Sequence, residues 1–402
     1  MAQVIVFAAT PVLARIYDAD AFGYLSLALA SASAVAPAAC LKLESALLLP
    51  KSDRQATAVF VAAALASALI SVACGIVLAV SFHFGFLPHL ASLQHFAWWV
   101  ASLVFLTSVF ALVSQLALRG ELYEAVARRS VHQAVVATAG QLALFFVLPL
   151  GGLVVGQVLG RLAGILPVLY SSRGLLSKFP PSFMAKVLCR YWRFPAIFTP
   201  SALLNALGLG LPLLFIGTQY GVQAAGQWGM ADRLLAAPVL LIGLATGQVL
   251  EARLASHLRR GGEAMMPLFL KSTAILLICA VALIFGVLLL AEIVLPWLLG
   301  PGWEESVRLA MILVVSTGFR LVAGPVARVL LVLQRAGANL AIDAMRVLAL
   351  VSVMALAVRK NFTVAEVAAW ITVALCLVYV VTWIVSFRAA RRFDEARLAQ
   401  AE

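Results

Sequence analysis

Four arginines lie inside long apolar segments of the 402-residue sequence, and their positions point most directly to chemistry: Arg161, Arg233, Arg320 and Arg346. A guanidinium group in the hydrocarbon of a bilayer costs at least roughly 2.5–3.5 kcal/mol on insertion scales. Such a group therefore faces a water-filled cavity or a partner. Because few acidic residues accompany these arginines, we expect a cavity that prefers anions. This pattern favours a transporter of a negatively charged substrate over a structural membrane protein.

Arg320 is the arginine that local pairing explains least. No acidic residue lies within one helical turn of it, and the small residue Gly318 and the helix-bending Pro325 lie nearby. Such residues permit a bent or broken helix beside a cavity. Asp343 and Arg346 are instead three residues apart, so an ion pair on one helix face explains them equally well.

Other charged residues in apolar segments extend the set of candidates. Asp232 and Arg233 are adjacent and project about 100° apart on a helix, which disfavours a direct pair. Lys42 and Glu44 fall in the inner third of the second predicted span, where a lysine also has the option of snorkelling to the interface. We therefore add Lys42 to the predicted cationic cavity. Glu44, Asp232 and Asp343 are predicted to orient basic neighbours or to carry a coupling ion.

The composition assigns the chain to the membrane. Hydrophobic residues make up 64% of the sequence and charged residues only 11%, whereas soluble domains carry about 25% charged residues. Apolar stretches of membrane-spanning length follow one another along nearly the whole chain, so we expect an all-α polytopic membrane protein. The net charge of +12 is explained by basic cytoplasmic loops, and no nucleic-acid partner is expected.

Twelve membrane spans are predicted from the apolar segments. They cover about 1–17, 22–48, 56–82, 96–118, 131–150, 152–172, 196–218, 223–250, 266–296, 306–332, 338–358 and 363–388. With the N-terminus in the cytoplasm, the inside loops collect most of the Lys and Arg, which predicts that both termini are cytoplasmic. The first span is short, so we treat the completeness of the N-terminus as open.

The spans divide into two halves. We expect a six-helix lobe over 1–172, a basic cytoplasmic connector over 173–195, a second six-helix lobe over 196–388 and a cytoplasmic tail over 389–402. Six spans per lobe predict parallel repeats about an axis along the membrane normal. A weak internal echo fits this prediction, because Ala21-Phe-Gly-Tyr24 resembles Ala225-Gly-Gln-Trp228.

Several kinds of chemistry find no support in the sequence. The GxxxxGK[ST] loop of ATPases and the GxSxG elbow of hydrolases are missing, and no large extramembrane domain is evident. The five cysteines are scattered without a CxxC pair. His83, His89 and His95 are six residues apart, a spacing that fits interfacial residues better than a metal site. We expect no cofactor and no metal.

Five stretches in order along the chain resemble those of a known family. They are Leu13-Ala-Arg-Ile-Tyr-Asp-Ala-Asp-Ala-Phe-Gly-Tyr24, Leu41-Lys-Leu-Glu-Ser-Ala-Leu-Leu-Leu-Pro50, Tyr191-Trp-Arg-Phe-Pro195, Gly226-Gln-Trp-Gly-Met-Ala-Asp-Arg-Leu-Leu-Ala-Ala-Pro238 and Leu299-Gly-Pro-Gly-Trp-Glu-Glu-Ser306. In these stretches the chain resembles the oligosaccharide flippases (O-antigen and polysaccharide translocases) of the multidrug/oligosaccharidyl-lipid/polysaccharide exporter superfamily. The shortened first helix departs from that pattern.

This resemblance implies a fold, a substrate and a location. It implies a V-shaped pair of lobes with a central cavity, and the passage of an undecaprenyl-diphosphate-linked oligosaccharide across the inner membrane for O-antigen or other polysaccharide synthesis. Membrane lipids and a polysaccharide polymerase machinery are the implied partners, and no enzymatic activity is implied. A diphosphate is also an anion that arginine forks bind well.

Two other functions stay open at this point. A cation-coupled multidrug exporter of the same superfamily would rely on acidic residues in its cavity, against which the arginines argue. A membrane-embedded glycan polymerase or ligase would need a sizeable outside loop, and the largest predicted outside loop, about 83–95, contains three histidines and no arginine.

Overall fold

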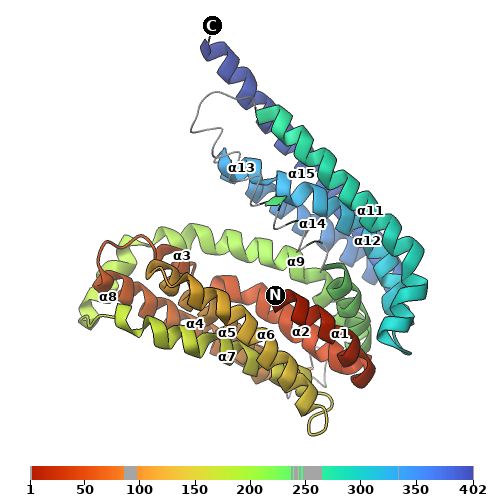
Figure 1. The fold of residues 1–402 in the computed structure, drawn as a ribbon, viewed down its shortest axis with the longest axis horizontal. Helices are drawn as coiled ribbons and strands as arrows, with labels where there is room; N and C mark the ends of the chain where they lie inside the picture. The colour runs from red at the N-terminus through yellow and green to blue at the C-terminus, as the bar shows by residue number, and fades with distance from the viewer. Residues whose placement is uncertain are drawn as a thin grey trace. The chain divides into compact units, whose positions relative to one another are not determined.

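The computed structural model describes residues 2–85, 97–236, 265–333 and 335–401, together with positions 239, 243, 246 and 247. Within these residues every regular element is a helix (Figure 1). The helices are α1 (Ala2–Ile16), α2 (Ala19–Ala39), α3 (Leu43–Ala46), α4 (Asp53–His83), α5 (Ala97–Arg119), α6 (Tyr123–Leu144), α7 (Gly152–Ser172), η2 (Arg173–Leu175), α8 (Pro181–Arg190), η3 (Phe194–Phe198), α9 (Thr199–Tyr220), a helix over 222–236, α11 (Met265–Leu299), α12 (Glu304–Val326), α13 (Arg328–Val332), α14 (Ala336–Lys360) and α15 (Val364–Ala401).

Nine helical segments of the described part are long and apolar enough to cross a membrane, and each corresponds to one of the twelve predicted spans. Of the other three, α1 has only 15 residues, and the span over 223–250 falls partly outside the described residues. The third, expected over 131–150, is instead α6, which begins at Tyr123 and carries Arg128 and Arg129 in its first turns. The polytopic helical class is confirmed, while the total of twelve spans stays a prediction.

Capping residues explain where several helices begin and end. The Asp18 carboxylate accepts a hydrogen bond from the Ala21 N–H at 2.8 Å and begins α2. Ser52 caps α4 in the same way through the Gln55 N–H. At the other end of a helix, Gly221 stops α9 with a φ of 90°, a conformation that glycine adopts without steric cost.

The chain divides into two compact units, Met1–Gly229 and Met230–Glu402. In the first unit α2 packs on α4, α5 and α9, and α6 packs along α7. The backbones approach very closely where α2 meets the helix over 222–236. There a Cβ atom built on Gly226 would lie only 2.9 Å from the Gly23 nitrogen, closer than real Cβ contacts come. Small residues permit such close helix crossings in membranes.

The second helix of the first unit does not run as predicted. The span expected over 22–48 stops at Ala39, and Leu41 and Lys42 adopt left-handed backbone conformations with φ of 52° and 55°. Such conformations cost roughly 1–2 kcal/mol per L-residue. The prediction that Lys42 and Glu44 lie within one continuous span was therefore wrong, since apolar residues continue through the break and hide it.

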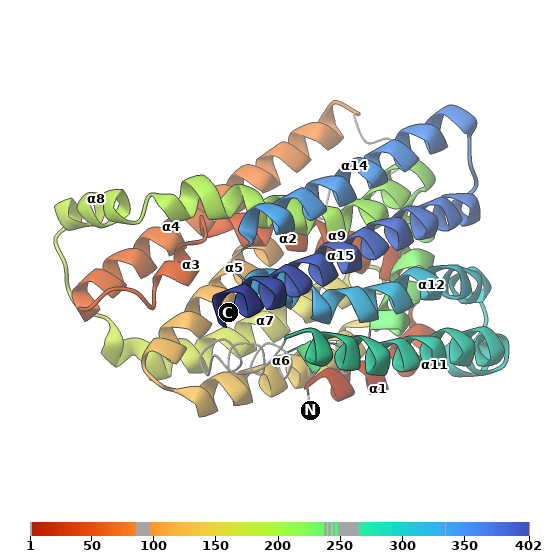
Figure 2. The same ribbon diagram turned by 90° about the horizontal axis from the view of Figure 1, so that it is seen from above.

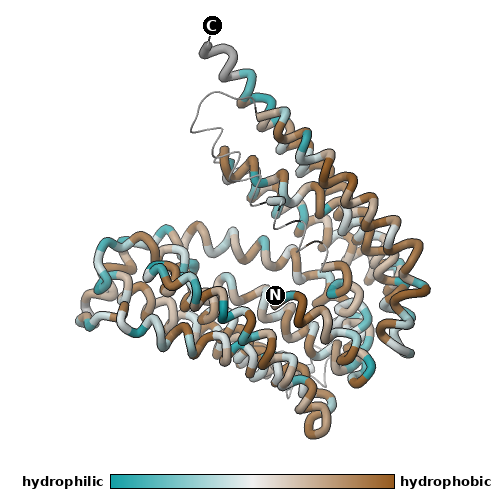
Figure 3. Tube along the Cα trace, viewed as in Figure 1, coloured by the Kyte–Doolittle hydropathy of each residue, from teal (hydrophilic) through white to brown (hydrophobic). Residues whose placement is uncertain are grey.

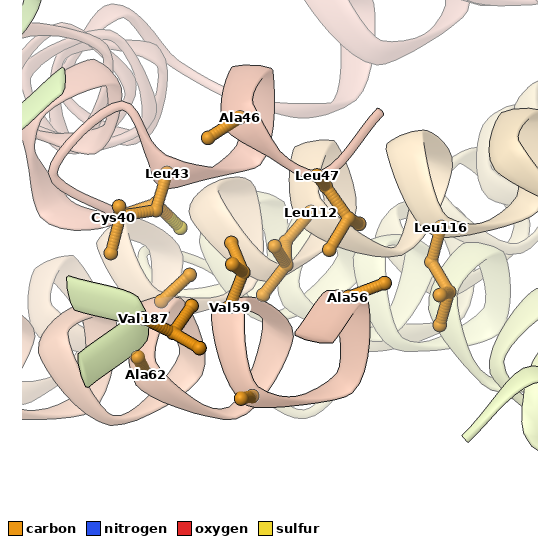
Figure 4. Close-up of a cluster of buried hydrophobic side chains, with 12 residues drawn as sticks. Cys40, Leu43, Ala46, Leu47, Ala56, Val59, Ala62, Leu112, Leu116 and Val187 are labelled. Atoms are coloured by element: carbon orange, nitrogen blue, oxygen red, sulfur yellow. The ribbon is translucent and has the colours of Figure 1, made fainter. Parts of the chain in front are cut away.

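A side chain from α5 and a hydrophobic cluster hold this broken segment. The Arg119 Nη1 atom donates to the Pro50 carbonyl at 2.7 Å, and its Nη2 atom contacts the Asp53 carboxylate at 3.1 Å. Leu43 and Leu47 are buried in a cluster that the connector helix α8 completes with Val187 (Figure 4). Burial of these side chains offsets the strain of the break.

In the second unit α11, α12, α14 and α15 lie side by side (Figure 2). Hydrophobic residues run along most of α11, as its colour in Figure 3 shows. Phe269 of α11 packs against Trp383 and Phe387 of α15. Near the end of α15, the Asp394 carboxylate accepts hydrogen bonds from the first two backbone N–H groups of α11, both at 2.8 Å. This contact ties the beginning of α11 to the end of α15.

Candidate functional site

A tyrosine and three charged residues from four helices lie within electrostatic range of one another inside the second unit. Tyr379 of α15 interacts electrostatically with Arg320 of α12, Arg346 of α14 and Asp232 of the helix over 222–236. Asp232 also lies within electrostatic range of Arg320. Tyr379 is buried, with 7% of its surface exposed. The structure thus brings together predicted residues that lie more than a hundred positions apart in the sequence.

Arg320 is the least satisfied cation of this group. It is half-buried near the C-terminal end of α12, and its Nε atom is buried without a hydrogen-bond partner. Within the described residues no carboxylate forms a salt bridge with it. At Gly318, two residues earlier, an added Cβ atom would collide with the Ile284 side chain of α11. The guanidinium group therefore retains capacity to bind an anion.

Arg346 and Asp343 form the local ion pair that their spacing allows. The Arg346 Nη2 atom lies 3.3 Å from the Asp343 carboxylate, and 13% and 18% of the two side chains are exposed. Pairing reduces the net charge that Arg346 brings to the group. Since Tyr379 also interacts with Arg346, the pair nevertheless belongs to the same charged group as Arg320.

Arg233 lies next to Asp232 on the helix over 222–236 and is half-buried. The Asp232 carboxylate also lies within electrostatic range of Arg320.

Arg161 occupies a separate position in the first unit. Its guanidinium carbon lies 5.1 Å from the centroid of the Phe110 ring, and Arg129 of α6 stacks on the same ring at 3.7 Å. The Arg129 Nη1 atom also donates to the Phe110 carbonyl at 3.1 Å. In the first unit Arg161 therefore lies beside Arg129, which was not among the predicted cavity residues.

Lys42 has a partner in the break between α2 and α3. Its Nζ atom lies 3.3 Å from one Glu44 oxygen, and the second oxygen of that buried carboxylate has no hydrogen-bond partner. The pair contributes little net charge, so the geometry supports Lys42 as an anion ligand less strongly than it supports Arg320.

Two contributors were missed in the sequence. Tyr379 lies in an uninterrupted apolar run, where a tyrosine is indistinguishable from a core residue. Arg129 was assigned to a loop because α6 was expected to begin only at 131. A search for arginines within one turn before each predicted span would have found Arg129, whereas no sequence signal distinguishes Tyr379.

The described residues contain no cluster of three or more possible metal ligands. Of the three histidines considered for a metal, His83 ends α4, while His89 and His95 lie outside the described residues. What the charged groups offer is recognition of a planar or tetrahedral anion by guanidinium forks.

Comparison with known proteins relates the chain to polysaccharide synthesis. A family model described as polysaccharide biosynthesis protein matches residues 12–308. The teichuronic acid biosynthesis protein TuaB of Bacillus subtilis (strain 168) is 25% identical over 247 residues, which cover 58% of this chain and 50% of TuaB. The chain thus spans about half the length of this curated relative.

Solved structures share the fold. The lipid II flippase MurJ in an inward closed conformation superposes with a TM-score of 0.75 at 11% identity, over 99% of this chain and 89% of MurJ. An inward-facing multidrug resistance MATE family transporter of the MOP superfamily gives a TM-score of 0.68 at 13% identity, over 100% and 96% of the two chains. At these identities the likeness shows the fold alone.

Proposed function

Because this chain belongs to the polysaccharide biosynthesis protein family, we propose that it translocates a lipid-diphosphate-linked oligosaccharide across a membrane. The substrate we propose is undecaprenyl-diphosphate-linked, and the membrane is the cell inner membrane, with both termini in the cytoplasm. The product would serve the synthesis of O-antigen or another polysaccharide. The chain itself would transport without changing the glycan, as its transporter fold suggests.

The observation that carries this proposal is Arg320. A half-buried guanidinium in a membrane-spanning helix, with no salt bridge in the described residues, is costly unless an anion or water satisfies it. A diphosphate presents several oxygen acceptors to such a group, and a bidentate contact suits the guanidinium geometry. Arg346 and Tyr379 add two donors within the same group.

The mechanism we propose is alternating access between two six-helix lobes, 1–172 and 196–388, that are related by a parallel pseudo-two-fold axis and form a V around a central cavity. Arg320, Arg346 and Arg233 would hold the diphosphate from the second lobe. Arg161 and Lys42 would contribute from the first, while Glu44, Asp232 and Asp343 orient these cations or carry a coupling ion. The lipid tail would remain in the bilayer.

A leaflet-relocation assay tests the function. Proteoliposomes containing the full chain and a fluorescent undecaprenyl-diphosphate oligosaccharide should move the label between leaflets faster than empty liposomes. Arg320→Ala should abolish this acceleration in a folded protein. Arg308→Ala provides the matched control, because Arg308 lies on the same helix but is exposed and paired with Glu305. Relocation by Arg320→Ala at the native rate would refute the central role of this residue.

The same labelled glycan separates the rival functions. A change in glycan length during the assay would indicate a polymerase or ligase. Relocation of a cationic drug, with none of the glycan, would indicate a multidrug exporter. We expect relocation of an unaltered glycan.

A further inference from the structure

Two arginines of the first unit share one aromatic ring. Arg129 and Arg161 come from neighbouring helices, α6 and α7, and both guanidinium groups stack on Phe110 of α5, at 3.7 and 5.1 Å from the ring centroid. Such contacts stabilise each cation by about 0.5–2 kcal/mol. They also bring two like charges together, and the two groups repel each other. The arrangement is favourable only if something else offsets that repulsion.

Among the described residues, no carboxylate forms a salt bridge with Arg129 or Arg161. Residues 125–231 contain no Asp or Glu at all. The nearest acidic residue before that stretch, Glu124, is already paired with Arg128, which precedes Arg129 in the sequence. The Nε atoms of both Arg129 and Arg161 are buried without a hydrogen-bond partner. Among the described residues, both partly buried guanidinium groups therefore keep N–H donors that are not hydrogen-bonded.

The two arginines lie at successive depths in the unit. Arg129 is six residues into α6, about 9 Å along the helix, whereas Arg161 lies near the middle of α7. The end of α5 at Gly120 packs against Leu175, just beyond α7, so the ends of these helices lie on one side. Arg129 is therefore nearer to that side than Arg161, and it is the side predicted to be cytoplasmic.

We propose that Arg129 and Arg161 form a binding site for the phosphate of a lipid headgroup in the first unit. The phosphate would lie against both guanidinium groups and replace the missing carboxylate. The headgroup would be either the diphosphate of the transported lipid or the phosphate of an anionic phospholipid. This inference deepens the proposed function and rests on it for the first of these two sources.

Binding measurements on the purified full chain in detergent test the site. The probes are fluorescent undecaprenyl diphosphate and fluorescent phosphatidylglycerol, titrated separately. We expect Arg129→Gln combined with Arg161→Gln to weaken binding of at least one probe by at least about tenfold, because charge-assisted hydrogen bonds are lost. Loss confined to undecaprenyl diphosphate would identify the transported lipid as the ligand, and loss confined to phosphatidylglycerol would identify a resident phospholipid.

Three variants keep the test decisive. Arg128→Gln changes the neighbouring arginine, which is exposed and paired with Glu124, and should leave both affinities unchanged. Arg129→Lys with Arg161→Lys retains the charges and should keep most of the affinity. Each single Gln variant replaces the double variant if the latter does not fold, as checked by its melting temperature.

The proposal is overturned if the Gln variants bind both probes as the native chain does, or if the native chain binds neither. Transport is measured separately, with the native chain and Arg320→Ala. Loss of relocation by the native chain would refute the proposed function without affecting the binding result, and unchanged binding by the Gln variants would refute the phosphate site without affecting transport.

Discussion

Gly23 and Gly226 occupy equivalent positions in a reciprocal helix crossing. A Cβ atom on Gly23 would collide with the carbonyl of Val222, four residues before Gly226, and one on Gly226 would collide with the carbonyl of Ala19, four residues before Gly23. Both glycines lie one turn after the start of their helices. The sequence echo between the two halves thus has a structural counterpart, with each glycine meeting the other helix at the same offset.

Substitution at this crossing should destabilise the protein. Gly23→Ala or Gly226→Ala would force apart two backbones that cannot yield as a side chain would, and we expect a cost of about 1–3 kcal/mol or more. The melting temperature of the purified variants measures this effect. Gly286→Ala in α11 is the matched control, because nothing lies within 4 Å of its added Cβ. It should be neutral or slightly stabilising; an equal loss at Gly286 would contradict the explanation.

Arg119→Ala should loosen the broken segment between α2 and α4. The substitution leaves the Pro50 carbonyl and the Asp53 carboxylate without their partner, at a cost of about 1–3 kcal/mol. We expect a lower melting temperature and faster tryptic cleavage after Lys51, which is exposed. Arg128→Ala removes a surface pair and should change neither value. Unchanged cleavage in Arg119→Ala would mean that the hydrophobic cluster alone holds the segment.

Asp394→Ala should release the beginning of α11. The carboxylate accepts hydrogen bonds from the N–H groups of Met265 and Met266, and loss of such a cap costs about 0.5–2 kcal/mol. Hydrogen exchange of the first turn of α11 should become faster, while exchange at mid-helix should not change. Glu395→Ala serves as the control, because Glu395 pairs with Arg391 on the surface of α15. If the first turn of α11 exchanged equally fast in both variants, Asp394 would not act as its cap.

A double-mutant cycle separates two roles of Arg346. If Arg346 only neutralises Asp343, combining Asp343→Asn with Arg346→Gln should restore the relocation rate that Arg346→Gln alone reduces. If it binds the diphosphate, the double variant should stay as slow as Arg346→Gln, with relocation reduced roughly tenfold or more. We expect the second result in the leaflet-relocation assay. Full recovery by the double variant would limit Arg346 to a local ion pair.

Long apolar runs allowed most of the fold to be predicted. Nine predicted spans match helices of spanning length, because membrane insertion depends on the length and composition of a segment rather than on distant contacts. The break at Leu41 and Lys42 could not be predicted in the same way. No glycine marks it, and it depends on Arg119 and on the cluster around Leu43, which only the folded chain brings together.

The candidate site was predictable in type but not in grouping. An arginine such as Arg320 stands out in an apolar run because its burial is costly. Which arginines share a neighbourhood depends on helix packing, and the structure places Arg161 with Arg129 in one unit and Arg320 with Tyr379 in the other. Tyr379 itself has no distinguishing feature in the sequence.

The stretch without acidic residues, 125–231, gives the first unit an excess of positive charge that attracts anions. Apart from His132, its positive charges belong to arginines and lysines. Dissolved ions screen the attraction of these charges for phosphate over a distance that falls from about 10 Å at 0.1 M to about 3 Å at 1 M. The ionic strength of the surrounding solution would therefore set how strongly this surface attracts a charged lipid.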